Sequence, residues 1–261
     1  MSAPKIGYFC INLASRPDRR EVLEEQAAKI GIDIVFIEAV LGKELDLEKV
    51  EQYDRATRLR RYHGDLSHGQ VGCALSHQKG IQAIADSDFD FGVLLEDDSI
   101  LYDGFVEFLN AAVVESTGWD AIQLHNHFEI EGPHRFPDEY HRKLVKKLVE
   151  TGGRHIIFPT QLSMNANSIL YTREAAEKFA RWFDRFDRAA DYHIRECHMA
   201  GLVLAEIQPG LTWQSDAESD NLFLAEHEKP RNMVSYVVRR LHIRLRRFLL
   251  FLRSPSIIRS Q

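Results

Sequence analysis

Three adjacent carboxylates, Glu96, Asp97 and Asp98, directly follow the apolar run FGVLL. In an open α/β sheet, ligands bind beyond the carboxyl ends of the strands, which is where this triplet would lie. Hard oxygen ligands so close together suit Mg²⁺ or Mn²⁺, ions that often also bind a substrate's phosphates. The alternative is an exposed acidic turn, and the abrupt change from apolar to acidic residues is what favours a metal site.

Three arginines follow the first apolar run of the chain, within INLASRPDRR. Arg16, Arg19 and Arg20 would lie at a strand-to-helix turn, from which arginine can bind a diphosphate in bidentate fashion. The alternative is that they form the solvated start of a helix.

Ser76 and His77 stand next to each other in GQVGCALSH. Because adjacent residues of a helix do not face each other, this pair cannot act as a hydrolase dyad, and nucleophilic serine catalysis is excluded. The small residues Gly72, Cys73 and Ala74 would instead let this helix pack closely against a neighbour.

The elements that must position these groups alternate between strands and helices. Ser67 and Thr172 are expected as helix N-caps, and RATRLRRYHGD, residues 55–65, is expected to be a mobile loop. The order of elements favours a mostly parallel central sheet with helices on its faces. Apolar runs predict strands at residues 5–13, 32–40, 91–98, 119–125 and 201–210, and helical spacing predicts helices at 20–31, 67–86, 104–116 and 172–186.

Composition and charge limit the function classes. The 261 residues are 44% hydrophobic and 28% charged, enough for one large core. From Arg231 onward the chain has eight arginines and no acid, so the rest carries 25 basic and 39 acidic residues, a balance of −14. Such an acidic body would repel phosphate, which excludes nucleic acid as a partner. We expect an α/β domain at residues 1–229 and a basic amphipathic helix at 230–261.

The three scattered cysteines predict reduced thiols in a cytosolic protein, with neither disulfides nor a zinc site. No apolar run is long enough for a membrane span, and the short apolar run near the N-terminus does not fit a secretory leader. A cytoplasmic protein is therefore expected.

Six stretches in register carry a family resemblance. INLASRPDRR, GQVGCALSH and LLEDDSIL, in this order and spacing, resemble glycosyltransferase family 25, the lipooligosaccharide-type glycosyltransferases. The likeness extends to FIEAVLGKEL, NANSILYTREAAEKFA and QPGLTWQSDAESD, and it covers most of residues 5–221. It implies a GT-A-like nucleotide-sugar-binding fold.

The resemblance also implies a site. The acidic triplet would correspond to a D-x-D motif, with Glu96 and Asp98 holding Mn²⁺ or Mg²⁺ against the diphosphate of a UDP-sugar. The sugar would be a hexose such as galactose, transferred with inversion to a glycan or glycolipid acceptor such as lipooligosaccharide. The sequence has Gln70 and Ala14 where the family usually has acids, which leaves the donor open. The implied donor-binding residues are Asn12, Arg16, Arg19, Ala39, Ser76, His77 and Asp97.

Inversion requires a base that takes the proton of the acceptor hydroxyl. Asp191, in DRAADYHIRE, falls near the start of a helix where the family also carries an aspartate. Asp187 and His193 are alternatives, and Asp191 as an ordinary N-cap is a structural interpretation of the same pattern.

The basic tail predicts an amphipathic helix. One interpretation is an interfacial helix on an anionic membrane at the cytoplasmic face, and the other is a helix that docks its apolar stripe on the domain. The predicted stripe is Val234, Val237, Val238, Leu241, Leu245, Phe248, Leu249 and Leu252, and the arginines predicted to point elsewhere are Arg239, Arg240, Arg246, Arg247 and Arg253.

Two function classes remain open. The first is a metal-dependent glycosyltransferase associated with the inner face of the membrane. The second is a non-catalytic sugar-nucleotide or carbohydrate-binding protein with the same fold, because a protein without turnover can keep the same core motifs.

Overall fold

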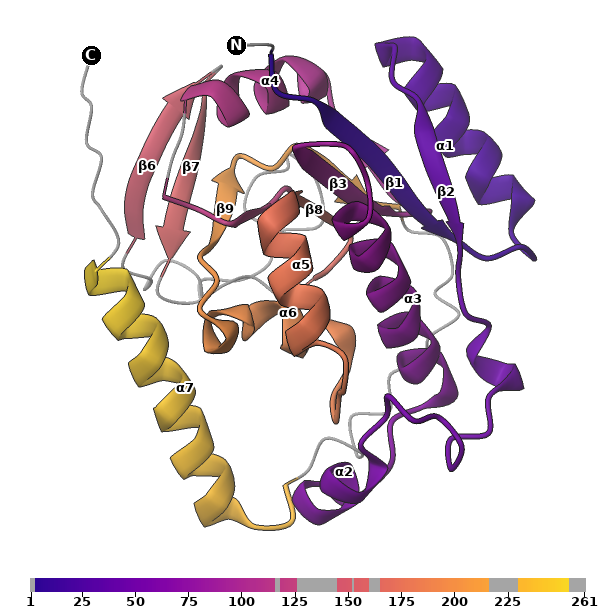
Figure 1. The fold of residues 1–261 in the computed structure, drawn as a ribbon, viewed down its shortest axis with the longest axis vertical. Coiled ribbons are helices and arrows are strands. Elements are labelled where there is room, and N and C mark those ends of the chain that lie inside the picture. Colours follow the sequence, from indigo (N-terminus) through magenta and orange to yellow (C-terminus); the bar gives the residue numbers. More distant parts are fainter. Residues whose placement is uncertain are drawn as a thin grey trace.

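The structure is a computed structural model that describes residues 3–115, 118–125, 145–151, 153–159, 165–215 and 230–253. Figure 1 shows the course of the chain. The strands are β1 (Ile6–Asn12), β2 (Ile34–Glu38), β3 (Phe91–Glu96), β4 (Ser99–Leu101), β5 (Ala121–Gln123), β6 (Val145–Thr151), β7 (Arg154–Pro159), β8 (Ser168–Thr172), β9 (Leu204–Gln208) and β10 (Thr212–Gln214). The helices are α1 (Pro17–Ile30), α2 (Arg55–Arg61), α3 (His68–Ala85), α4 (Phe105–Glu115), α5 (Arg173–Trp182), α6 (Ala190–Arg195) and α7 (Met233–Arg253), with 3₁₀ turns η1 (Gly42–Glu44) and η3 (Cys197–Ala200).

One eight-stranded sheet forms the centre, in the order β2-β1-β3-β8-β5-β9-β7-β6. β1 pairs in parallel with β2 and β3, and β5 pairs in parallel with β9. β8 is antiparallel to both β3 and β5, and β7 is antiparallel to both β9 and β6. All strands of this sheet except β7 and β8 therefore run in the same direction, so the predicted α/β fold with a mostly parallel sheet is confirmed.

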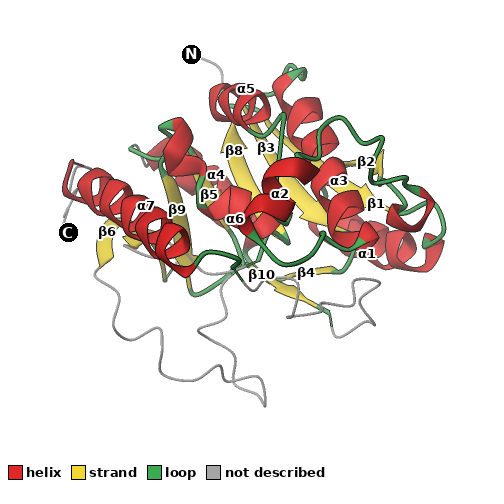
Figure 2. Cartoon of the chain, turned by 90° about the horizontal axis from the view of Figure 1, so that it is seen from below, coloured by secondary structure: helices red, strands yellow, loops and turns green. Residues whose placement is uncertain are grey.

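Helices cover both faces of the sheet (Figure 2). Alternate residues of β1 point to opposite faces: Phe9 joins the core under α3, α5 and α6, and Cys10 joins the core under α1 and α4. The side chains of β3 alternate in the same way: Leu94 lies in the core with Phe9, and Val93 lies in the core with Cys10. β1 and β3 are thus buried on both faces, which explains why they appear in the sequence as continuous apolar runs.

Local signals in the sequence set the helix ends. Pro17 opens α1, whose Gly31 C-cap adopts a left-handed conformation with φ 72°. Ser67 caps α3 as predicted: its hydroxyl accepts from the Gln70 amide, and the Gln70 side chain accepts from the Ser67 amide. Thr172 caps α5, also as predicted, by accepting from the Ala175 amide. Glutamine and glutamate are equivalent in such a capping box, so Gln70 has a structural role at this position.

Residues 55–65 are not the mobile loop that we predicted. Residues 55–61 form α2, capped by Asp54, and the Arg58 side chain is fully buried. Arg58 Nε donates to the Gly64 carbonyl at 2.8 Å, and its guanidinium lies 4.3 Å from the centre of the Tyr62 ring. These partners stabilise the buried Arg58 and with it the segment 55–65. The segment was predicted to be a solvated loop because it is rich in charged residues.

The second half of the sheet contains strands that the sequence did not predict. β8 directly follows Asn167, and β6 forms a hairpin with β7 in a region where the sequence predicted no strand. Residues 126–144, and residues 216–220 of QPGLTWQSDAESD, lie outside the described residues.

The predicted C-terminal helix is present as α7 and lies along one side of the body (Figures 1 and 2). Its described apolar stripe is exposed, from 40% at Phe248 to 73% at Val234. The hypothesis that the stripe docks on the domain is therefore wrong. Residues outside the stripe make the attachment: the buried Arg247 donates to the Pro159 and Leu204 carbonyls, and Arg239 pairs with Glu196. Leu250 packs against the core, and a His198 ring nitrogen lies 3.2 Å from the Ile243 carbonyl oxygen. Among the described helices, none has both the length and the apolar composition needed to cross a bilayer.

Candidate functional site

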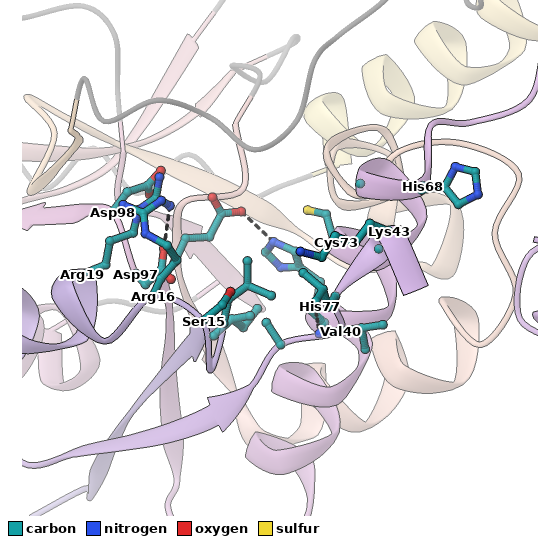
Figure 3. A pocket seen from close by; sticks show the side chains of 18 of the residues that line it. Ser15, Arg16, Arg19, Val40, Lys43, His68, Cys73, His77, Asp97 and Asp98 are labelled. Atoms are coloured by element: carbon teal, nitrogen blue, oxygen red, sulfur yellow. Dashed lines mark hydrogen bonds and ion pairs between the residues drawn. The ribbon is translucent and has the colours of Figure 1, made fainter. Parts of the chain in front are cut away.

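A cavity of about 590 Å³ lies at the carboxyl ends of β1 and β3. The loop after β2 and the N-terminal half of α3 form its opposite wall. Figure 3 shows Asp97, Asp98, Arg16 and Arg19 together on one side, with Cys73 and His77 reaching in from α3. The acidic triplet is thus placed where the sequence predicted it, at the edge of the sheet where ligands bind. The predicted donor-binding residues that line the cavity are Arg16, Arg19, Ala39, Ser76, His77 and Asp97.

Asp97 is bound by protein groups on both carboxylate oxygens. Arg19 Nη1 lies 3.0 Å from Asp97 Oδ1, and Asn12 Nδ2 donates to Asp97 Oδ2 at 2.9 Å. The side chains of Arg19 and Asp97 are only 12% and 9% exposed, so this ion pair is largely shielded from water. Asn12, which the sequence analysis assigned to the donor, is buried and orients Asp97.

Two side-chain amides hold the Asp98 carboxylate. Asn167 Nδ2 donates to Oδ1 at 2.8 Å, and Gln214 Nε2 donates to Oδ2 at 2.9 Å. Burial and the negative charge of Glu96 raise the pKa of Asp98 to about 6. A carboxylate in such surroundings is stabilised by a nearby cation. Glu96 and Asp98 therefore fit a divalent ion by chemistry and by charge.

Backbone pairing explains the position of Gln214. β4 and β10 are antiparallel with Ser99 opposite Gln214, and the Ser215 amide donates to the Asp98 carbonyl at 2.8 Å. Asn167 immediately precedes β8, whose Ser168 is paired with Leu95 of β3. Both amides are thus fixed by strands adjacent to the triplet.

Asn165 supports the two amides from a strained position. Its φ of 123° is unusual for a residue with a side chain. Its Oδ1 accepts from the Asn167 amide at 2.6 Å, and its Nδ2 donates to Gln214 Oε1 at 2.9 Å. Asn165, Asn167 and Gln214 lie in segments that carry the family resemblance, but no role was predicted for them from the sequence. The detectable signal was the pair of asparagines directly before an apolar run.

The Glu96 side chain points toward α3, whereas the Asp98 side chain points toward Asn167 and Gln214. Its Oε1 lies 2.8 Å from His77 Nε2, and the His77 side chain is only 1% exposed. Cys73, one helical turn earlier, joins this pair: the ligand atoms of Cys73, His77 and Glu96 all lie within 4.8 Å of one another.

Ser76 connects α3 to the loop after β2. Its hydroxyl accepts from the Val40 amide at 2.8 Å and donates to the Gly72 carbonyl at 2.7 Å. A Cβ on Gly72 would lie 2.7 Å from the Val40 oxygen, so this contact requires glycine. Ala39 continues the same wall, and its amide donates to the Asn12 carbonyl at 2.9 Å. Ser76 and His77 have separate partners, as their adjacent positions on a helix predicted.

The arginines after β1 divide into two groups. Arg16 and Arg19 line the cavity, and Arg16 also pairs with Asp18 at 2.8 Å. Arg20 pairs with Glu24 and stacks on Phe36, with its guanidinium 4.2 Å from the ring centre. Arg20 is not among the cavity-lining residues, so the suggestion that it reaches a diphosphate is not supported.

Asp191 lies in the first turn of α6, but the N-cap of that helix is Ala189. The interpretation of Asp191 as an N-cap is therefore wrong. Burial, followed by the charge of Glu96, raises the pKa of Asp191 to about 6, although His77, Arg195 and the Ala166 amide lower it. Asp191 does not line the cavity, but its carboxylate interacts electrostatically with Glu96 and His77, which do.

The alternative bases face other groups. Asp187 pairs with Arg61 at 2.5 Å, and burial raises its pKa less than Arg188, Arg61 and Arg239 lower it. His193 stacks on Phe183 with ring centres 5.0 Å apart. Burial, followed by the charge of Arg188, lowers the pKa of His193 to about 3. Neither residue lines the cavity.

Comparisons with known proteins identify relatives of this chain. Procollagen galactosyltransferase 1-B of Xenopus laevis is 30% identical over 125 residues, which are 44% of this chain and 20% of that protein. A glycosyltransferase 25 family member of Drosophila pseudoobscura pseudoobscura is 31% identical over 94 residues, 34% of this chain and 15% of that protein. The match thus spans a fifth or less of the length of these relatives.

A solved structure, A197 from STIV, is similar over 87% of this chain and 92% of its own, with 11% identity and a TM-score of 0.43. This similarity is low, so the fold assignment depends on the strand order described above.

A family model described as glycosyltransferase family 25 (LPS biosynthesis protein) matches residues 5–194. The match takes in the acidic triplet, the arginines after β1 and the Cys73–His77 turn of α3. Because it extends over well more than half of the sequence, this chain belongs to glycosyltransferase family 25.

Proposed function

We propose that this protein is a metal-dependent inverting glycosyltransferase that moves a hexose from a UDP-sugar to a cell-surface glycan. We propose galactose as the first candidate for the sugar and lipooligosaccharide as the first candidate for the acceptor. Membership in family 25 supports the transfer of a sugar. The observation that carries the proposal is the position of Glu96 and Asp98, which line one cavity together with Arg16 and Arg19.

The cavity suits a nucleotide sugar in size and in charge. Its volume of about 590 Å³ is within the range of small-molecule sites. Arg16 and Arg19 supply positive charge for a diphosphate, and the loop that begins at Ala39 offers backbone groups to the nucleoside. Asp97 fixes Arg19, so it acts on the donor through that arginine.

Glu96 and Asp98 are the residues that would hold Mn²⁺ or Mg²⁺. When bound, such an ion supplies Lewis-acid stabilisation for the negative charge that develops on the leaving diphosphate. Asn167 and Gln214 keep both oxygens of Asp98 in fixed positions, and such outer partners orient the ligands of a metal site.

Asp191 is the proposed base. Glycosyl transfer passes through an oxocarbenium-like transition state, and inversion needs a proton acceptor for the incoming hydroxyl. With its pKa raised to about 6, Asp191 is ionised near neutral pH and is a better base than an ordinary aspartate. Its carboxylate interacts electrostatically with Glu96 and His77, which line the cavity.

The alternative is a protein of this fold that binds a sugar nucleotide without turnover. We would separate the two by measuring UDP release from UDP-galactose and other UDP-sugars, with and without Mn²⁺, in the presence of mixed glycan acceptors. Transfer requires metal-dependent UDP release that increases with acceptor. Donor binding by calorimetry without any UDP release would establish the binding protein instead.

A separate observation favours association with a membrane surface. The stripe of α7 is exposed, while the helix is attached to the body through Arg239 and Arg247. Those two arginines contact the body of the protein, so they do not serve anionic headgroups as was predicted from the sequence. Arg240, Arg244 and Arg246 are exposed, and Arg240 donates to the Tyr236 hydroxyl of the same helix. We propose that α7 inserts its stripe into an anionic bilayer and thereby keeps the enzyme beside a lipid-linked acceptor.

A further inference from the structure

Cys73, His77 and Glu96 offer one sulfur, one nitrogen and one oxygen ligand. Cys73 and His77 are four residues apart on α3, a spacing that brings two side chains to the same face of a helix. Glu96 ends β3 and meets that face, so that the three ligand atoms lie within 4.8 Å of one another. Figure 3 shows Cys73 and His77 projecting from α3 toward the acidic side of the cavity.

Mg²⁺ and Ca²⁺ bind through oxygen, whereas thiolate and imidazole together select borderline or soft ions. Zn²⁺ is commonly bound by cysteine, histidine and carboxylate ligands in one site. We propose that Cys73, His77 and Glu96 form a binding site for Zn²⁺ or a similar transition-metal ion.

The charges around Cys73 support a cation at this position. Cys73 lies beside the Glu96 carboxylate and lines the same cavity as Asp97 and Asp98. These carboxylates create a negative potential that attracts a divalent ion. On binding, the thiol gives its proton to solvent and a sulfur–metal bond replaces the sulfur–hydrogen bond.

His77 has a ring nitrogen to offer. Nε2 is paired with Glu96, but Nδ1 is buried and has no hydrogen-bond partner among the residues that the structure describes. Nε2 is therefore the nitrogen on the side of Glu96, and an ion bound there would replace the hydrogen bond between Nε2 and Glu96 with one bond to each of them.

The site shares Glu96 with the proposed Mn²⁺ or Mg²⁺ site. Zn²⁺ at Cys73 and His77 would withdraw that carboxylate from Asp98, so we expect Zn²⁺ to inhibit transfer at a fixed Mn²⁺ concentration. This consequence rests on the proposed function, whereas the binding of Zn²⁺ itself does not.

Cobalt substitution tests the site without any substrate. We would titrate the full chain with Co²⁺ and record the near-ultraviolet thiolate-to-cobalt charge-transfer band, then displace Co²⁺ with Zn²⁺. Wild-type protein should show the band and lose it on addition of Zn²⁺. Cys73→Ser should lack the band and bind Zn²⁺ at least about a hundredfold more weakly, since loss of an outer-shell partner alone costs about ten- to a hundredfold.

Two control variants make the result specific. Cys10→Ala removes a thiol that is fully buried in the opposite core and should keep the band. Asp98→Asn should lose transfer but keep the band, which separates this proposal from the proposed function.

A wild-type protein without the band, or a Cys73→Ser protein that retains it, would overturn the site. If Cys73→Ser does not fold, as judged by circular dichroism, His77→Gln takes its place. In that variant the loss of a nitrogen ligand should weaken Zn²⁺ binding while the thiol is still present, and unchanged Zn²⁺ affinity would refute the proposal.

Discussion

Gln214 donates a hydrogen bond of 2.9 Å to the Asp98 carboxylate, although the two residues are 116 positions apart. The short β4–β10 ladder makes this contact, because it places Gln214 opposite Ser99, the residue after Asp98. The function proposed for Asp98 thus depends on a residue beyond the region matched by the family model.

We expect Gln214→Ala to weaken metal dependence rather than to abolish transfer. Without the amide, one Asp98 oxygen loses its donor, and loss of such an outer-shell partner costs about ten- to a hundredfold in metal affinity. The Mn²⁺ concentration at half-maximal rate measures this effect. Gln82→Ala, at an exposed glutamine of α3, is the matched control. An unchanged Mn²⁺ requirement in Gln214→Ala would show that this amide does not orient Asp98.

Asp98→Asn should abolish transfer and retain the fold. The substitution removes a charge from the proposed cation site and nearly conserves volume. Because the asparagine amide has one acceptor oxygen, either Asn167 or Gln214 loses its acceptor. At pH 7 this loss opposes the gain from removing a charge whose pKa is raised to about 6, so we expect little net change in the free energy of unfolding. UDP release and thermal denaturation measure the two effects.

Asp103→Asn, at an exposed position, should behave like the wild type in both assays. Wild-type turnover in Asp98→Asn with metal supplied would remove Asp98 from the mechanism. Glu96→Gln should also reduce transfer, though by less if the first acid contacts the ribose rather than the ion.

The general position of the site could be predicted from the sequence. An apolar run that ends in three carboxylates, and another followed by arginines, place both groups at the carboxyl edge of a parallel sheet. Ser67 and Thr172 gave the starts of α3 and α5 because N-capping is a local interaction.

Contacts distant in sequence could not be predicted in this way. Asn167 and Gln214 meet Asp98 through strand pairing, which no local pattern encodes. Asn165 supports both amides from the same place. Arg58 was predicted to be solvent-exposed because arginine is charged, and the sequence pattern did not show that the Gly64 carbonyl and the Tyr62 ring accommodate it. The exposure of the α7 stripe was also not predicted, since Arg247 and the off-stripe Leu250 make contacts with the body instead.

Asp191→Asn should reduce turnover by about a hundredfold or more while donor affinity stays unchanged, because a base acts only as the transition state forms. The control is donor binding by calorimetry in the same variant. In the wild type, the rate should fall as pH drops through about 6, where Asp191 takes up a proton. Asp98 also titrates at about 6, but its effect should shift with Mn²⁺ concentration because proton and metal compete. A turnover number like that of the wild type would exclude Asp191 as the base.

The same variant should be more stable than the wild type at pH 7. The pKa of Asp191 is raised in the folded state from 3.8 to about 6, so its contribution to stability is fully present below pH 3.8 and is lost as pH rises through about 6. Asparagine has no charge to desolvate, and its oxygen still accepts from the Ala166 amide. We expect Asp191→Asn to gain about 1–3 kcal/mol at pH 7 and nothing near pH 4. Chemical denaturation at both pH values measures the difference, and a gain that is equal at both would contradict this cause.

The last prediction concerns α7. Its exposed stripe should insert into lipid, while Arg240, Arg244 and Arg246 lie among anionic headgroups, each contributing about 1 kcal/mol. We expect the full chain to sediment with vesicles rich in phosphatidylglycerol and to remain in solution with phosphatidylcholine alone. Raising the salt concentration should weaken the binding, because salt screens the arginines from the headgroups.

Point substitutions test this better than deletion of α7, because deletion would also remove the buried Arg247 that contacts Pro159 and Leu204. The double variant Leu241→Gln and Leu245→Gln changes residues that are 59% and 56% exposed, so the fold should be unaffected. It should release the protein from anionic vesicles and keep its activity on a soluble acceptor. Val22→Gln changes a residue of α1 that is 58% exposed and should sediment like the wild type. If the double variant still sediments, the stripe does not insert into lipid. If it instead converts a dimer in solution to a monomer, the stripe is an interface between two copies of the chain.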